Sequence, residues 1–138
     1  MKTKPSFFIG IIMCIGLIAS FSFQTNQAFD LKASMARGKE IYVSYCISCH
    51  MELGTGIENV YPPLAKADYL MADKKRSIQQ VLYGASGEMK INGKTYNAPM
   101  TGFDLNDDQA SDVLNYVRNS WGNKSAAIKP ADVKAARK

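Results

Sequence analysis

The feature that most constrains this 138-residue chain is the run Cys46-Ile47-Ser48-Cys49-His50. The chain has three cysteines in all and a single histidine, and that histidine closes this run. Two thiols three residues apart lie about one helical turn apart, on one side of the backbone. The imidazole follows directly. A fold for this chain therefore has to place two thiols and its only imidazole against whatever group they hold.

Zinc binding, thiol exchange and a plain disulfide compete with covalent haem attachment as roles for this run. A structural zinc site uses four Cys or His ligands, and this run supplies three. A thioredoxin-like motif needs alternating strands and helices around it, and no such pattern flanks Cys46. A plain disulfide in an exported protein remains open. The adjacent His favours haem, so the run predicts one haem c held by thioethers to Cys46 and Cys49, with its iron bound by His50.

The N-terminus predicts export from the cytoplasm. Two lysines among the first four residues precede residues 5–23, which carry no charge and are mostly apolar. This pattern is typical of a secretory signal peptide, with cleavage after Ser22 or Ala28. The run is also close to the length that spans a bilayer, so an uncleaved membrane anchor stays open. Residues 1–28 are thus a signal peptide or an anchor, and the rest works in the periplasm or on the outer face of the cytoplasmic membrane.

The remainder of the chain is mildly basic. From Phe29 onward there are fifteen basic and twelve acidic residues, a net charge of +3. No basic run is interleaved with aromatic residues, as a nucleic-acid groove requires, so we expect no nucleic-acid partner.

Apolar periodicity predicts a helix on each side of a central pocket region. The first runs through the Cys-containing run, because its apolar residues recur at spacings of four and three. The second begins at Asn106, a good helix cap, and ends at Gly122. One face of the first helix carries Leu31, Met35, Gly38, Tyr42, Tyr45 and Cys49, and one face of the second carries Ala110, Val113, Leu114, Val117 and Trp121.

From about Leu31 to Asn123 the chain resembles the class I cytochrome c family. The resemblance rests on Gly38-x-x-x-Tyr42-x-x-x-Cys46, on the five-residue run, and on the closing segment 116–123. It implies an all-α class I cytochrome c fold in residues 29–123, with three to five helices around one haem. It also implies that Gly38 lies in close contact with the last helix.

Residues 61–64, Tyr-Pro-Pro-Leu, form an extended segment with no backbone donor at either proline. In the family, the residue two before such a leucine offers its carbonyl to the second nitrogen of the iron-bound imidazole. The resemblance therefore implies that Pro62 orients His50 and that Leu64 contacts the haem. An acceptor on Nδ1 would leave Nε2 for the iron.

A sixth ligand to the iron has to come from a methionine, because no second histidine exists. Met35 belongs to the first helix face, Met51 follows His50 too closely, and Met71 precedes a helix, which leaves Met89 and Met100. The resemblance selects Met100, since the family places its axial methionine just before the last helix. Many relatives have a proline directly after this ligand, whereas here Thr101 follows and Pro99 precedes it.

The remaining segments are connections. Asp73 is placed to cap a helix that ends near Tyr83. Asn92-Gly93 between short alternating runs predicts a small β-hairpin near residues 88–97. Residues 124–138 are rich in Lys and Ala with few large apolar side chains, and predict a basic, mobile tail.

Iron bound by both His50 and Met100 has no open position, which argues for electron transfer over catalysis. We therefore expect a one-electron carrier, not an enzyme, that exchanges electrons with redox protein partners in a respiratory chain. The alternative is a haem c subunit of a membrane-bound dehydrogenase, oxidase or reductase complex. A peroxidase or ligand-binding haem enzyme would need Met100 off the iron.

Overall fold

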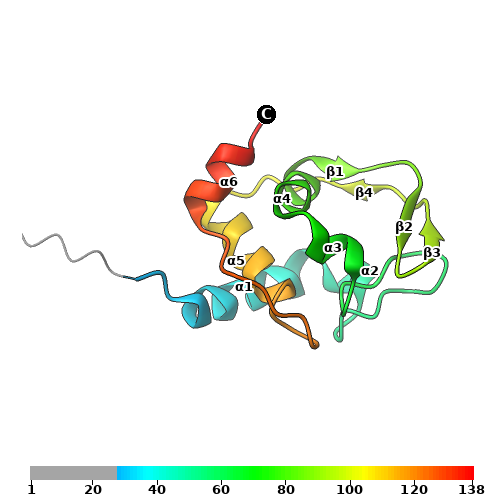
Figure 1. The fold of residues 1–138 in the computed structure, drawn as a ribbon, viewed down its shortest axis with the longest axis horizontal. Coiled ribbons are helices and arrows are strands. Elements are labelled where there is room, and N and C mark those ends of the chain that lie inside the picture. Colours follow the sequence, from blue (N-terminus) through cyan, green and yellow to red (C-terminus); the bar gives the residue numbers. More distant parts are fainter. Residues whose placement is uncertain (1–27) are drawn as a thin grey trace, which may run out of the picture.

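The computed structural model describes residues 28–138, and Figure 1 shows it as a set of helices with two small pairs of strands. The predictions for the signal or anchor segment fall almost wholly outside the described residues. Within residues 28–138, no helix has the length and apolar character needed to cross a bilayer. In chain order the elements are α1 (Leu31–Tyr45), α2 (Ile47–His50), α3 (Asp68–Ala72), α4 (Lys74–Tyr83), β1 (Gly84–Ala85), β2 (Met89–Ile91), β3 (Lys94–Tyr96), β4 (Met100–Thr101), α5 (Asp107–Val117) and α6 (Pro130–Ala136).

Side-chain hydrogen bonds to the backbone fix where α5 and α4 begin. The Asn106 side chain accepts the Gln109 backbone N–H, and the Gln109 side chain accepts the N–H of Asn106, a reciprocal cap that begins α5. Asp73 caps α4 in a similar way by accepting the backbone N–H of Arg76. The predicted starts of both helices are confirmed.

The two small sheets differ in how far the sequence predicts them. The hairpin β2–β3 pairs Met89 with Tyr96 and turns at Asn92 and Gly93, whose φ angles of 50° and 81° are those of a tight hairpin turn. This hairpin is confirmed. The pairing of β1 with β4, which joins Gly84 to Thr101 and Ala85 to Met100, has no short-range signal in the sequence.

Helices α1 and α5 pack against each other at Gly38, as the resemblance implies. A Cβ atom at Gly38 would lie only 1.9 Å from the carbonyl oxygen of Asp112 on α5. The ring of Tyr42 then packs against Tyr116 and Trp121, with centroids 5.4 and 5.1 Å away. Glycine at this one position lets the two backbones touch, and the aromatic rings fill the space beside the contact.

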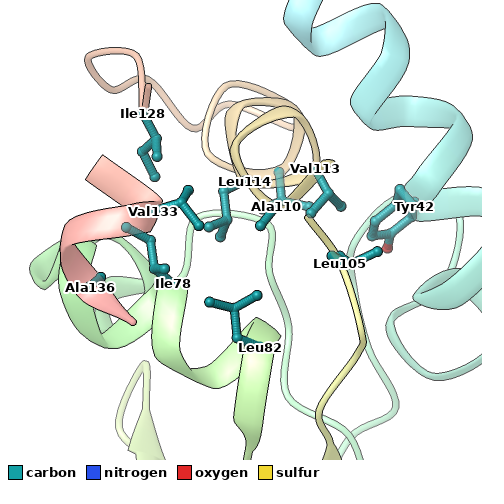
Figure 2. Close-up of a cluster of buried hydrophobic side chains, with 11 residues drawn as sticks. Tyr42, Ile78, Leu82, Leu105, Ala110, Val113, Leu114, Ile128, Val133 and Ala136 are labelled. Carbon is teal, nitrogen blue, oxygen red and sulfur yellow. The ribbon is translucent and has the colours of Figure 1, made fainter. Parts of the chain in front are cut away.

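The C-terminal segment corrects the prediction of a mobile tail. Residues 130–136 form α6, which lies beside α4 and α5 at the end of the molecule away from the hairpin (Figure 1). Figure 2 shows Ile128 and Val133 pointing into the same cluster as Leu114 of α5. The Asn115 side chain holds the segment by donating to the Ile128 carbonyl and accepting its N–H, at 2.8 and 2.7 Å.

This correction has a physical reason. The tail has few large apolar residues, but Ile128, Val133 and Ala136 are at most 4% exposed and belong to the core cluster. Val133 and Ala136 reach the core because they lie three residues apart in a helix, which puts them on the same face, even though the segment holds few apolar residues. Residues 29–123 contain five helices, within the three to five expected, and the sixth helix of the described residues lies in the segment that was expected to be mobile. The all-α class with one small hairpin is otherwise confirmed.

Candidate functional site: a cavity between two thiols, an imidazole and a thioether

A cavity of about 420 Å³ lies between α1, the loop that follows α2, α4, and the segment that leads to α5. Its volume is in the range of small-molecule and cofactor sites, and most of its lining side chains are apolar. All six residues predicted to hold the cofactor line it, namely Cys46, Cys49, His50, Pro62, Leu64 and Met100.

The two thiols lie at the junction of α1 and α2. Cys46 ends α1, and the backbone N–H of His50 then donates to the Cys46 carbonyl at 2.9 Å, so the chain turns once between them. Both thiols are half-buried and free. Burial raises the pKa of the Cys46 thiol to about 11, and the nearby Cys49 thiol adds to the shift. Both sulfur atoms thus face the cavity as free cysteines rather than as a disulfide.

His50 is 8% exposed and is held by one carbonyl. Its Nδ1 lies 2.9 Å from the carbonyl oxygen of Pro62. A carbonyl only accepts, so Nδ1 carries the proton and Nε2 keeps its lone pair. Burial lowers the pKa of His50, and the hydrogen bond to Pro62 partly opposes that effect. The imidazole is therefore neutral near pH 7, the state in which it binds a metal.

The loop between His50 and Leu64 is built to place the Pro62 carbonyl. Gly56 donates its N–H to the carbonyl of His50 at 3.0 Å, and Leu64 donates to the carbonyl of Gly54 at 2.7 Å. A Cβ at Gly56 would meet the Pro62 oxygen at 2.5 Å. Both glycines have φ of 63°, the left-handed region that glycine adopts at no steric cost. These two glycines do more than allow a turn, because they set the distance between His50 and the Pro62 carbonyl that accepts its hydrogen bond.

Trp121 supports this loop from the turn that follows α5. Its indole lies so close to Gly54 that a Cβ there would be 2.5 Å from the ring. The Met51 carbonyl, one residue after His50, accepts a hydrogen bond from the buried Tyr42 hydroxyl at 2.6 Å. Sequence reasoning placed these two aromatics on helix faces only, since nothing local in the sequence links them to the loop.

Met89 and Met100 both line the cavity, whereas Met35, Met51 and Met71 do not. The sulfur of Met89 accepts a hydrogen bond from the Gln80 side chain at 3.6 Å. Met100 lies in β4, whose pairing with β1 fixes its backbone against the end of α4. Gly102 permits this approach, because a Cβ there would lie 2.6 Å from the Leu82 carbonyl oxygen. Met89 and Met100, the two candidates for the second ligand of the iron, therefore differ in their surroundings.

Several cavity residues were missed by sequence reasoning. Tyr69, Gln80 and Phe103 line the cavity, and none belongs to a motif. Gln80 offered the one available signal, a polar side chain beside the inward-facing Val81 on α4. Among residues 28–138, no three His, Cys, Asp or Glu side chains gather into a metal site, which gives no support to the zinc alternative there.

The residues present fit a covalently attached haem. The apolar cavity suits a macrocycle, the two thiols suit thioether bonds, and the donor set of neutral imidazole and thioether is one that haem iron takes in electron-transfer proteins. Cys46 and Cys49 would hold the ring, and His50 and Met100 would bind its iron.

Comparison with known proteins leads to the same family. Residues 35–121 match the family described as cytochrome c. Cytochrome c-552 of Thermus thermophilus is 34% identical over 115 residues, which cover 78% of this chain and 77% of that protein. The cytochrome c subunit of the quinone alcohol dehydrogenase of Gluconobacter oxydans is 31% identical over 83% of this chain. The chain spans about a quarter of that subunit, since the match covers 24% of it.

A third relative is the subunit CcoP of the cbb3-type cytochrome c oxidase of Azospirillum brasilense, 28% identical over 80% of this chain and 36% of that protein. The matched residues contain most of α1, the Cys-containing run, the cavity and α5. The chain therefore belongs to the cytochrome c family, in its class I monohaem type, which carries one covalently bound haem c with its iron.

Proposed function

We propose that the chain transfers single electrons outside the cytoplasm, with haem held by Cys46 and Cys49 and its iron bound by His50 and Met100. The observation that carries this proposal is that these four side chains line one cavity, with the Pro62 carbonyl 2.9 Å from Nδ1 of His50. When bound, the haem supplies an iron that accepts and releases one electron. The chain's own residues fix the ring, orient the imidazole and exclude water.

Met100 is the better candidate for the second axial position. The Met89 sulfur is engaged by Gln80, and Met89 lies on the hairpin, whose two strands pair only with each other within residues 28–138. Met100 is fixed from both sides, by the pairing with Ala85 and by the approach of Gly102 to α4. A ligand held in this way needs little rearrangement when the iron changes its charge.

The absorption spectrum tests the ligand set. The oxidised protein should show the charge-transfer band of His–Met ligation, and Met100→Ala should abolish it and let the reduced protein bind carbon monoxide. Met89→Ala is the matched control, because it removes the same side chain from the same cavity and should keep the band. Loss of the band in Met89→Ala with retention in Met100→Ala would transfer the role to Met89. Carbon monoxide binding by the unmodified protein would support a ligand-binding enzyme instead.

We further propose that residues 1–28 direct export, so that the haem domain works in the periplasm or on the outer membrane face. Mass spectrometry of the N-terminus of the purified protein distinguishes cleavage after Ser22 or Ala28 from retention. Recovery of the unprocessed chain in the cytoplasmic fraction would contradict export.

The role as a separate carrier or as a complex subunit depends on the partner. The Thermus relative is named as a cytochrome and the Gluconobacter relative as a dehydrogenase subunit, and the two match this chain at similar identity. We favour the separate carrier, because the match covers most of the first relative's length and a quarter of the second's. Purification from detergent-solubilised membranes tests this choice, since a stable complex with a dehydrogenase or oxidase would favour the subunit.

A further inference from the structure

The backbone of Met51, the residue directly after His50, has a conformation that residues with side chains rarely adopt. Its φ is 64° and its ψ is 162°. This region is populated almost only by glycine, because a Cβ atom crowds the backbone there. A residue stays in such a conformation only when its surroundings hold it. The fold must therefore hold the chain firmly at the point where it leaves the predicted iron ligand.

Three hydrogen bonds hold the backbone of Met51. Its N–H donates to the Ile47 carbonyl at 2.9 Å, and its carbonyl accepts the Gly54 N–H at 3.0 Å. The third bond comes from α1, because the Tyr42 hydroxyl donates to the same Met51 carbonyl at 2.6 Å. The Tyr42 ring is buried against two other aromatic rings, which fix the position of its hydroxyl. Burial also raises the pKa of Tyr42, so the hydroxyl keeps its proton and remains a donor.

A chain of hydrogen bonds leads from the Met51 carbonyl to the acceptor of the imidazole. Gly54 donates to Met51, and the carbonyl of Gly54 in turn accepts the N–H of Leu64 at 2.7 Å. The two prolines before Leu64 have restricted φ angles, so little freedom remains between Leu64 and the Pro62 carbonyl. That carbonyl lies 2.9 Å from Nδ1 of His50. Its position thus depends on Gly54, and through Gly54 on Met51.

We propose that Tyr42 is a positioning residue for the iron ligand: its hydroxyl holds the strained backbone of Met51 and thereby keeps the Pro62 carbonyl on Nδ1 of His50. This inference rests on the proposed binding of iron by His50. Without the hydroxyl, the backbone of Met51 is free to relax to a negative φ, which turns its carbonyl and moves Gly54. The hydrogen bond on Nδ1 then loosens, and the imidazole loses the acceptor that fixes its orientation.

The hydroxyl of Tyr42 has a role separate from that of its ring. The ring packs between α1 and the aromatic side chains that follow it on α5 and in the next turn. A phenylalanine would fill almost the same space and keep these contacts, so packing does not require the oxygen. Tyr42→Phe therefore removes the hydrogen bond to the loop while it leaves the contact between the helices in place.

Exchange of the Nδ1 proton of His50 with deuterium oxide measures how firmly the Pro62 carbonyl holds this proton. NMR of the reduced, haem-loaded protein follows it. Tyr42→Phe should raise the exchange rate by about tenfold, the effect of losing one buried hydrogen bond. The backbone amide of Asn115, buried in α5, reports opening of the whole core, and its exchange rate should rise less than that of Nδ1.

Tyr116→Phe is the matched control for the loss of a hydroxyl. It removes the same atom from the neighbouring ring, whose centroid lies 5.4 Å from that of Tyr42, and this hydroxyl has Ser120 beside it instead of the loop. Exchange of the His50 proton in this variant should stay within about twofold of the wild-type rate, since no hydrogen bond to the loop is lost.

Substitution of Met51 tests the strain itself. Glycine adopts a φ of 64° at no steric cost, so Tyr42→Phe/Met51→Gly should exchange within about twofold of the wild-type rate. Tyr42→Phe/Met51→Ala is the matched control, because alanine also shortens the side chain but keeps the Cβ that causes the strain. This second double variant should exchange as fast as Tyr42→Phe. The Met51 side chain does not line the cavity, so neither change removes a contact with the haem.

Two results would overturn the inference. The first is an Nδ1 proton in Tyr42→Phe that exchanges no faster than in Tyr116→Phe, or whose rate rises only as much as that of the Asn115 amide. The second is an equal rate in the glycine and alanine double variants. In either case a wild-type spectrum with His–Met ligation leaves the proposed function standing, whereas a wild-type protein whose iron is not bound by His50 overturns both.

Discussion

Replacing Gly38 with alanine tests the contact between the first and last long helices. In an isolated helix this change stabilises by about 1 kcal/mol, because alanine is the better helix former. In this fold the new Cβ would lie 1.9 Å from the Asp112 carbonyl oxygen, where ordinary contacts begin at 3.4 Å. The helices would have to separate by about 1.5 Å to relieve the overlap.

Separating α1 from α5 in this way would cost free energy of folding. A gap of only about 0.5–1 Å already loses roughly a quarter to a half of the dispersion energy of the contacts it opens. Overpacking of this kind costs about 1–3 kcal/mol. The same movement would stretch the hydrogen bonds that Ser34 and Arg37 of α1 make to the Asp112 carboxylate, both 2.6 Å long. The strain therefore exceeds the gain in helix propensity, and we expect Gly38→Ala to lower the free energy of unfolding by about 2 kcal/mol.

Urea denaturation of the haem-loaded protein, followed by circular dichroism, measures this change. Ala36→Gly is the control, since Ala36 is exposed on the same helix and should lose about 1 kcal/mol from propensity alone. One substitution replaces glycine with alanine and the other alanine with glycine, yet both should lower the free energy of unfolding. A Gly38→Ala protein as stable as the wild type, or more stable, would refute the helix contact.

Two further predictions concern the core and the imidazole. Val133→Ala should lower the free energy of unfolding by about 2 kcal/mol, because it leaves a cavity in the core, whereas Val43→Ala, at a residue 51% exposed, should cost less than about 0.5 kcal/mol. If the two substitutions lowered the free energy of unfolding equally, Val133 would not be part of the core, and residues 124–138 would be a mobile tail. In the haem-loaded protein the iron would occupy Nε2 of His50 while Nδ1 donates to the Pro62 carbonyl, so His50 has no nitrogen free to take up a proton as the pH falls from about 7.5 to about 5. The absorption spectrum should therefore stay unchanged over this range, and a spectral change with a midpoint near the ordinary histidine pKa of about 6.5 would contradict iron binding at His50.

Features carried by short runs of sequence could be predicted. The caps at Asp73 and Asn106 and the turn at Asn92-Gly93 depend on residues within four positions of one another, and each is present. The approach at Gly38 came from the resemblance and is also present. Local sequence signals therefore predicted where these helices and the hairpin begin, and the family motif predicted how the first helix packs.

Features that depend on distant partners could not be predicted. The burial of α6 depends on Asn115, which lies 13 residues before Ile128 and carries no sign of its role in the sequence. Arg76 and Arg118 lie 42 positions apart in the sequence, yet they donate to consecutive carbonyls of α3. The charge of Arg76 in the sequence does not distinguish a cation in water from one stacked on a tyrosine ring.

The contribution of α6 to the core separates two tasks within one fold. Val133 and Ala136 pack into the cluster that α4 and α5 share, whereas the residues that line the haem cavity all lie between Tyr45 and Val117. Helix α6 therefore stabilises the helices behind the cavity without lining it. A substitution in α6 can lower the stability of the protein while the ligands of the iron keep their places.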